Sequence, residues 1–146
     1  MTKYLPLLVL GLLLPFSGLS NALTVSCGES NGYAYYFEGG LVGEELSGFQ
    51  EDGISNGKFS LTVNDEGEAD ILAIDATGTI KSATSQGGNV ALFSAGDGGF
   101  NWMVAYGDGT IEVYSYNVSS NSVAAYRNTV GNPNIAKNSL FVSDCD

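Results

Sequence analysis

The side chains that could do chemistry in this sequence are carboxylates, hydroxyls, tyrosines and two thiols, because the chain has 16 acidic residues and no histidine. Without histidine, Ser-His-Asp and Cys-His catalysis in their usual forms and most zinc sites are excluded. An enzyme would have to use a pair of carboxylates about 5–9 Å apart, as in glycoside hydrolysis. No pair of acids stands out by its spacing, so we predict no catalytic residue, no metal site and no cofactor.

Tyrosines beside acids form the candidate binding surface. In one extended run, Glu112, Tyr114 and Tyr116 share a face, because side chains alternate along a strand. The carboxylate of Glu112 indicates that this face meets water, which would expose two tyrosines beside an acid. Such a platform can stack on a sugar or pack against a protein; the alternative is that the tyrosines fill a barrel or cover the second face of a sheet. Tyr36 and Glu38 show the same pairing, so the predicted ligand-binding residues are Glu112, Tyr114, Tyr116, Tyr36 and Glu38.

Two further motifs suggest chemistry but are better explained as turns. The acids of the segment 65–70 place oxygen ligands at alternate positions, as a calcium site would. However, Gly67 is misplaced for an EF-hand and the terminal glutamate is missing, which favours a solvated acidic turn. The segment 75–79, Asp-Ala-Thr-Gly-Thr, resembles the phosphorylation loop of P-type ATPases. A β-turn accounts for the same residue types, and the large α/β domain that serves that loop is missing from this sequence.

The first 22 residues have the three parts of a secretory signal peptide. Lys3 supplies the positive start, residues 5–16 are mostly apolar, and Ser20-Asn21-Ala22 places small residues three and one positions before a cut. The apolar stretch is shorter than the roughly 20 residues that a membrane span needs. We therefore predict a cleaved signal peptide over residues 1–22, a single domain over residues 23–146, and a secreted or periplasmic location.

The two cysteines predict a structural disulfide. Cys27 and Cys145 lie near the two ends of the exported domain, and thiols in an oxidising compartment pair. A redox-active pair would need closer spacing, such as C-x-x-C. In the chain-entropy model, closing a loop of this length stabilises the fold by about 4–5 kcal/mol. The bond also requires the first and last strands to lie close together.

The charge of the chain restricts its partners. The formal charge of the whole chain is −11, and loss of Lys3 with the signal peptide makes the exported domain one unit more negative. Such a charge repels the phosphates of nucleic acids and anionic membranes, so neither is a predicted partner after signal cleavage. It favours cationic partners, although it also serves simply to keep a domain soluble.

The exported part has the sequence of an all-β domain. Short runs rich in β-branched and aromatic residues alternate with turns rich in Gly, Asn, Asp and Ser. Their spacing is typical of sandwiches and barrels, and neighbouring end strands favour a closed architecture over an open sheet. We predict a single antiparallel β-barrel or β-sandwich of about 8–9 strands, its termini joined by the disulfide. The expected strands are 33–37, 59–63, 70–75, 79–83, 90–94, 101–106, 110–118, 122–127 and 139–143.

The layout of the chain resembles small exported bacterial β-proteins of unassigned function. The likeness is carried by the opening segment 27–42, with its cysteine, paired glycines and Tyr-Ala-Tyr-Tyr-Phe run, by the segment 70–78, and by the terminal cysteine. The resemblance spans most of the exported domain. It implies no activity, cofactor or site residue.

The function that these patterns favour is a non-enzymatic, secreted or periplasmic binding domain with an acidic surface and an aromatic patch. Its predicted partner is a cationic protein or a glycan; one concrete version is an acidic inhibitor of a basic secreted enzyme such as a lysozyme. Two alternatives are a small carboxylate-dependent polysaccharide hydrolase and a surface-assembly subunit that accepts a strand from another chain.

Overall fold

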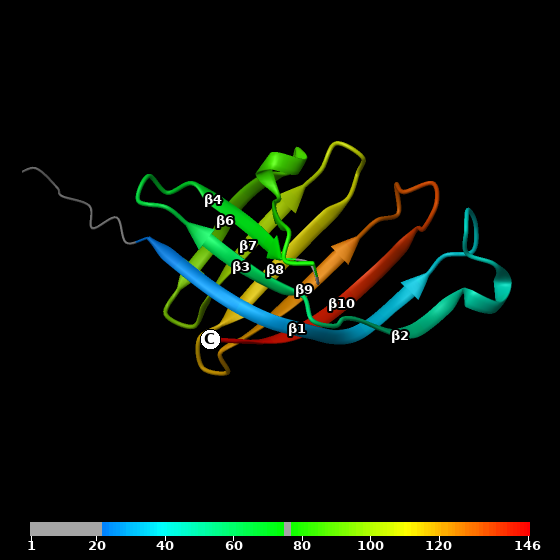
Figure 1. Cartoon of the computed structure of the whole chain (residues 1–146), viewed down its shortest axis with the longest axis horizontal. Coiled ribbons are helices and arrows are strands. Elements are labelled where there is room, and N and C mark those ends of the chain that lie inside the picture. Colours follow the sequence, from blue (N-terminus) through cyan, green and yellow to red (C-terminus); the bar gives the residue numbers. More distant parts are fainter. Residues whose placement is uncertain (1–21, 75–76) are drawn as a thin grey trace, which may run out of the picture.

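β-strands make up most of the described structure (Figure 1). A computed structural model describes residues 22–74 and 77–146; nearly all of the predicted signal peptide, together with Asp75 and Ala76, lies outside the described residues. No helix in the described part is long and apolar enough to cross a bilayer. The strands are β1 (Leu23–Tyr36), β2 (Gly48–Ile54), β3 (Lys58–Val63), β4 (Ala69–Ile74), β5 (Ile80–Ser82), β6 (Asn89–Gly96), β7 (Gly99–Ala105), β8 (Ile111–Asn117), β9 (Ser122–Asn128) and β10 (Lys137–Cys145), with short 3-10 turns η1 (Glu44–Leu46) and η2 (Thr84–Gln86).

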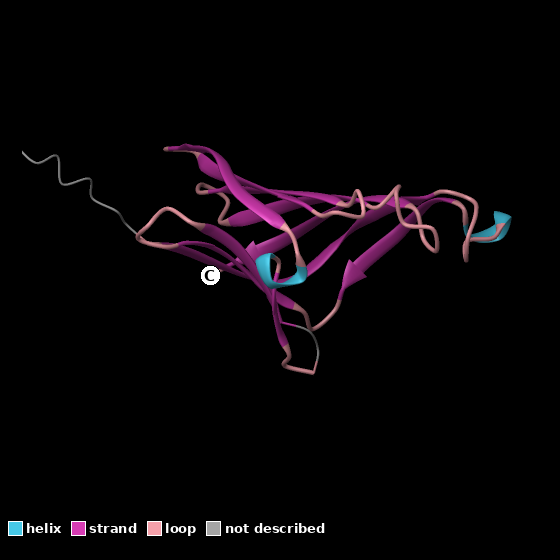
Figure 2. Ribbon diagram, turned by 90° about the horizontal axis from the view of Figure 1, so that it is seen from above, coloured by secondary structure: helices cyan, strands magenta, loops and turns pink. Residues whose placement is uncertain are grey.

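The strands form one antiparallel sheet in the order β5-β4-β3-β1-β10-β9-β8-β7-β6, with β2 added beside β1. The sheet curls into a half-barrel rather than lying flat (Figure 2). The first and last strands pair directly, and a disulfide joins Cys27 to Cys145. The predicted all-β class, the pairing of the end strands and the disulfide are therefore confirmed. Within the described residues, no hydrogen-bonded ladder joins β5 to β6, so the curl leaves a seam.

Strand β1 is long because it serves two parts of the molecule. Its first residues, Leu23 to Cys27, pair with β3, whereas Ser30 to Tyr36 pair with β2 on the same side. Strands β2 and β3 thus form one interrupted strand along β1. At the interruption Asn56 adopts a positive φ of 57°, and its backbone N–H donates to the carboxylate of Glu29. Beyond this break β1, β2 and β10 project from the half-barrel as a ribbon, which we call the extension (Figure 1).

The core lies inside the curl. Leu61, Trp102, Val104 and Val123 are the largest fully buried side chains, and they come from strands on both sides of the curl. Leu61 is flanked on its strand by partly buried apolar side chains, as the alternation of its sequence predicts. Removing this apolar surface from water is the main driving force for the curl.

Candidate functional site

A cavity of about 500 Å³ opens at one end of the half-barrel. It lies where β3 and β8 begin and where β4 and β9 end, so the hairpins of the two sides face one another across it. Its volume is within the range of small-molecule sites. The apolar part of its wall includes Phe59, Ile71, Ala83, Tyr114, Ala125 and Phe141.

A buried carboxylate stands in the cavity wall. Glu112 is only 8% exposed, although its side chain is acidic. One of its oxygens lies 3.0 Å from Nε of Arg127, which sits directly opposite on the neighbouring strand. The other oxygen accepts a hydrogen bond of 2.9 Å from the Tyr114 hydroxyl. Removing a carboxylate from water is costly unless it is paired, and both partners here supply that pairing. We call Glu112, Tyr114 and Arg127 the cavity trio.

The phenols beside Glu112 are held in their neutral form. Burial raises the pKa of the Tyr106 hydroxyl to about 12, and the negative charge of Glu112 adds to the effect. Burial also raises the pKa of Tyr114 well above its ordinary value, again with Glu112 contributing. Both hydroxyls therefore remain hydrogen-bond donors across the physiological pH range.

The predicted orientation of β8 was wrong. Glu112 does not mark a solvent-facing surface: it is buried, and the strand turns Ile111, which is 42% exposed, toward water instead. The physical reason is the register of the β8–β9 hairpin, which places Arg127 opposite Glu112 and makes burial of the acid tolerable. The structure brings Glu112 and Tyr114 together in the cavity wall, as predicted for neighbours on one face. Tyr116 shares their face but lies toward the other end of β8, where it stacks on Phe100.

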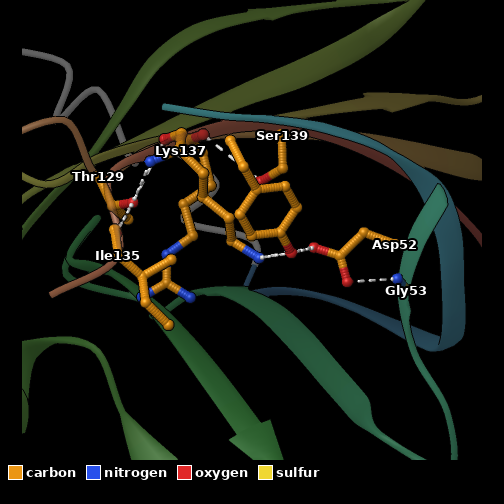
Figure 3. Close-up of polar contacts among 8 residues, drawn as sticks. Asp52, Gly53, Thr129, Ile135, Lys137 and Ser139 are labelled. Atoms are coloured by element: carbon orange, nitrogen blue, oxygen red, sulfur yellow. Dashed lines mark hydrogen bonds and ion pairs between the residues drawn. The ribbon is translucent and has the colours of Figure 1, made fainter. Parts of the chain in front are cut away.

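Tyr36 belongs to a second polar cluster, in the extension. Its hydroxyl donates a 2.8 Å hydrogen bond to Asp52, and Nζ of Lys137 lies 2.6 Å from the same carboxylate oxygen. Figure 3 shows Lys137 reaching toward Asp52, whose second oxygen accepts from the Gly53 amide. Tyr36, Asp52 and Lys137, which we call the extension trio, come from β1, β2 and β10 and join these three strands. Glu38 follows β1, is exposed, and takes no part in either trio.

The charges of the extension trio reinforce one another. Burial acts to raise the pKa of Asp52, but hydrogen bonds from Lys137, Tyr36 and the Gly53 amide outweigh it and lower the pKa. Burial acts to lower the pKa of Lys137, and the contacts with Asp52 and Tyr36 reverse that effect and raise it. Both groups therefore stay ionised over a wide pH range.

The acidic turn 65–70 uses its oxygens within the protein. The side chain of Asn64 accepts hydrogen bonds from the amides of Glu66 and Glu68, which shapes the turn. Asp70 accepts from the hydroxyls of Ser82 and Thr84. Across residues 22–74 and 77–146, no group of three acids or cysteines is placed to hold a metal ion.

Arg127, Lys137 and Asp52 are the functional or structural partners that the sequence analysis did not single out. The signal for Arg127 was present: a short turn joins β8 to β9, and counting outward from it places Arg127 opposite Glu112. Asp52 and Lys137 lie far apart in sequence, and only the threefold meeting of β1, β2 and β10 brings them together.

Comparison with known proteins adds no assignment. No protein-family model, no curated protein and no solved structure matches this chain. The resemblance to small exported bacterial β-proteins stays a prediction, and the geometry of the cavity and of the surface carries the functional argument.

Proposed function

We propose that the protein is an exported binding protein that holds a small, largely apolar ligand in the cavity at the end of the half-barrel. The observation that carries the proposal is the placement of Glu112, 8% exposed, in the wall of a cavity rather than in a seam between packed strands. A buried ion pair is a poor source of stability, so a polar cluster at such a place is better suited to orienting a ligand.

Export and the binding role support one another. The disulfide between Cys27 and Cys145 fits an oxidising compartment outside the cytoplasm. A half-barrel with an apolar cavity and a few convergent polar groups has the general form of a small-molecule carrier or sensor.

The hydrolase alternative gains no support from the carboxylates. A general acid for glycoside hydrolysis needs a raised pKa. Among the described carboxyls with a resolved shift, the change is in the opposite direction: the pKa values of Asp52, Asp70 and Asp108 are all lowered. For Asp108 the main cause is the hydrogen bond from the Thr110 amide.

The test uses the neutral fluorescent probe N-phenyl-1-naphthylamine and the disulfide-bonded protein. Ala125 lies in the cavity wall opposite Tyr114, so Ala125→Phe should fill the space. We expect the probe to brighten with the parent protein and its affinity to fall by about tenfold or more in the variant, a loss of roughly 1.4 kcal/mol or more. Thermal unfolding checks that the variant is folded. Equal binding by both proteins would refute the proposal.

A separate surface favours a second function, the binding of a cationic protein. On the outer face of the extension, Tyr35 packs edge to face against Phe37 and Phe49, with ring centroids 5.1 Å apart in each pair. Phe49 is 82% exposed. The acids Glu38, Glu44, Glu45 and Glu51 belong to the same part of the chain, so this patch combines exposed aromatic surface with negative charge.

Surface plasmon resonance with a lysozyme as the basic probe tests this second function. We expect binding that weakens steeply with added salt and falls about tenfold in Phe49→Ser, because aromatic anchors dominate interfaces. Since Phe49 is exposed, the substitution should change the free energy of unfolding by less than about 0.5 kcal/mol. Affinity for a neutral chitooligosaccharide in place of the protein would contradict it and favour a glycan.

A further inference from the structure

The basic residues of this acidic protein gather at one place. After residue 22 the chain has four of them, Lys58, Lys81, Arg127 and Lys137. The first three line the cavity, where the described acids are Asp108 and Glu112. Three of the four basic residues of a chain with a formal charge of −11 therefore lie at this cavity.

The cavity trio has hydrogen-bond donors that its carboxylate does not use. Each oxygen of Glu112 has one partner within the trio, Arg127 for the first and Tyr114 for the second. Arg127 makes that contact through Nε alone, and its side chain is 50% exposed. Within the described residues, its two terminal nitrogens have no hydrogen-bond partner. Glu112 thus contacts one edge of the guanidinium, and the terminal nitrogens of this half-exposed side chain in the cavity wall form a fork that matches a carboxylate or sulfonate.

A phenol adds a donor along the wall. Tyr106 lines the cavity, and its raised pKa of about 12 keeps the hydroxyl protonated. The acceptor Asp108 is already engaged by the Thr110 amide.

We propose that the cavity binds a small amphipathic anion, whose carboxylate or sulfonate head meets Arg127 and whose apolar body packs against Phe59, Ile71 and Phe141. The inference rests on the proposed function and adds the charge of the ligand to it. A cation would be repelled by Lys58 and Arg127 in the same wall. A neutral ligand would give up the charge-assisted hydrogen bonds that the terminal nitrogens of Arg127 can donate, which costs binding free energy.

The experiment compares two probes with the same aromatic rings. 8-Anilinonaphthalene-1-sulfonate carries the anion, and N-phenyl-1-naphthylamine lacks it. With the disulfide-bonded protein at low salt, we expect the sulfonate to bind about tenfold tighter, against the repulsion of the net negative charge. Raising the ionic strength from about 0.02 M to about 0.5 M should remove most of that advantage and leave the neutral probe unaffected.

Matched double variants locate the effect. Glu112→Gln with Arg127→Gln removes the charges of the cavity trio and leaves amides that can still accept from Tyr114. Asp52→Asn with Lys137→Gln makes the same change in the extension trio, outside the cavity. We expect the preference for the sulfonate to disappear in the first and to persist in the second. Lys58→Gln, at an exposed position of the cavity wall, should lower sulfonate affinity about threefold, since a rim charge contributes modestly.

Each outcome has a defined meaning. Equal affinity for the two probes, or preference for the neutral one, overturns the anion while the proposed binding function stands. Binding of neither probe overturns both. A sulfonate preference that survives Glu112→Gln with Arg127→Gln, or that the extension variant removes equally, also overturns the inference, because the anion would then be held elsewhere.

Discussion

The cavity trio and the extension trio contain the same three kinds of side chain. Each has a tyrosine that donates to a carboxylate and a cation that pairs with it. In the extension, the side chains of Lys137 and Asp52 are equally shielded, at 21% exposure each. In the cavity, the acid is 10% exposed and the arginine 50%. Similar side chains thus have two different roles. In the extension, the equally shielded pair of Lys137 and Asp52 joins strands. In the cavity, the buried Glu112 leaves the half-exposed Arg127 accessible to a ligand.

The two trios also differ in the number of strands that they join. Tyr36, Asp52 and Lys137 come from three strands that meet only in the extension, and the Lys137 ammonium also lies 5.0 Å from the Tyr36 ring centroid. All three side chains of that cluster contact one another. Glu112, Tyr114 and Arg127 come from a single hairpin that needs no such joining. The backbone ladder already joins β8 to β9, so the Arg127 side chain is available to contact a ligand.

The largest expected effect comes from breaking the close approach of β1 to β10 in the extension. A Cβ added to Gly32 would lie 1.9 Å from the backbone oxygen of Leu140, so Gly32→Ala must push β1 away from β10. We expect a loss of about 3 kcal/mol in the free energy of unfolding, measured in urea, at the upper end of overpacking costs.

Gly28 provides the matched control for this prediction. A Cβ there meets nothing within 4 Å, so Gly28→Ala should leave stability within about 0.5 kcal/mol of the parent. If both variants unfold at the same urea concentration, close approach of β1 and β10 is not what holds the extension.

An intermediate effect distinguishes the two cations. Arg127→Ala leaves a carboxylate that is 10% exposed without its cation, and Lys137→Ala leaves one that is 21% exposed. We expect losses of about 2 kcal/mol and about 1 kcal/mol, because the more deeply buried charge has less access to water. Thermal unfolding at neutral pH gives the order, and a larger loss for Lys137→Ala would reverse our view of which trio is the more buried.

The smallest effects are changes in how the stability of the fold depends on pH. One acts on the acid side of the pH profile and the other on the alkaline side. The lowered pKa of Asp52 gives stability that is present above about pH 4 and is lost as the pH falls through the folded-state value. Asp52→Asn should flatten that acid limb.

The raised pKa of Tyr106, about 12, gives stability that is complete below about pH 10 and is lost as the pH rises toward 12. Tyr106→Phe should flatten the alkaline limb by about 1 kcal/mol after allowance for its partial exposure. Lys137, whose pKa is also raised, contributes to the same limb in both proteins. A melting-temperature profile from pH 3 to pH 11.5 measures both limbs, and an unchanged alkaline limb would show that Tyr106 is not desolvated.

Strands whose apolar residues alternate could be predicted from the sequence, whereas a strand whose pairing is decided by a distant segment could not. The run at Leu61 was found because its inward side chains are apolar. Strand β2, Gly48–Ile54, carries two acids and two glycines, which are poor strand formers. It forms because β1 continues past the barrel and offers a free edge. No local pattern contains that information.

The orientation of β8 shows a second limit. A carboxylate on a face is ordinarily evidence for water, and that rule placed Glu112 outside. The rule fails where a cation on the neighbouring strand pairs with the carboxylate, as Arg127 of β9 does with Glu112 of β8. The prediction was wrong because it considered β8 without its neighbour. Pairing β8 with β9 through their short turn would have placed Arg127 beside Glu112 and would have warned that the tyrosine face is the inner one.

The disulfide has a mechanical consequence. Cys27 and Cys145 lie close to the two ends of the described fold, within a few residues of Leu23 and Asp146. If the two ends are pulled apart, tension passes from one flank to the other through the sulfur bridge. The chain from Gly28 to Asp144 then carries no load, and the cavity keeps its shape under a force that would shear β1 from β10 in the reduced protein. Single-molecule stretching of the oxidised and reduced forms should differ accordingly, with rupture confined to the pairing of residues Leu23 to Cys27 with β3 as long as the bridge is intact.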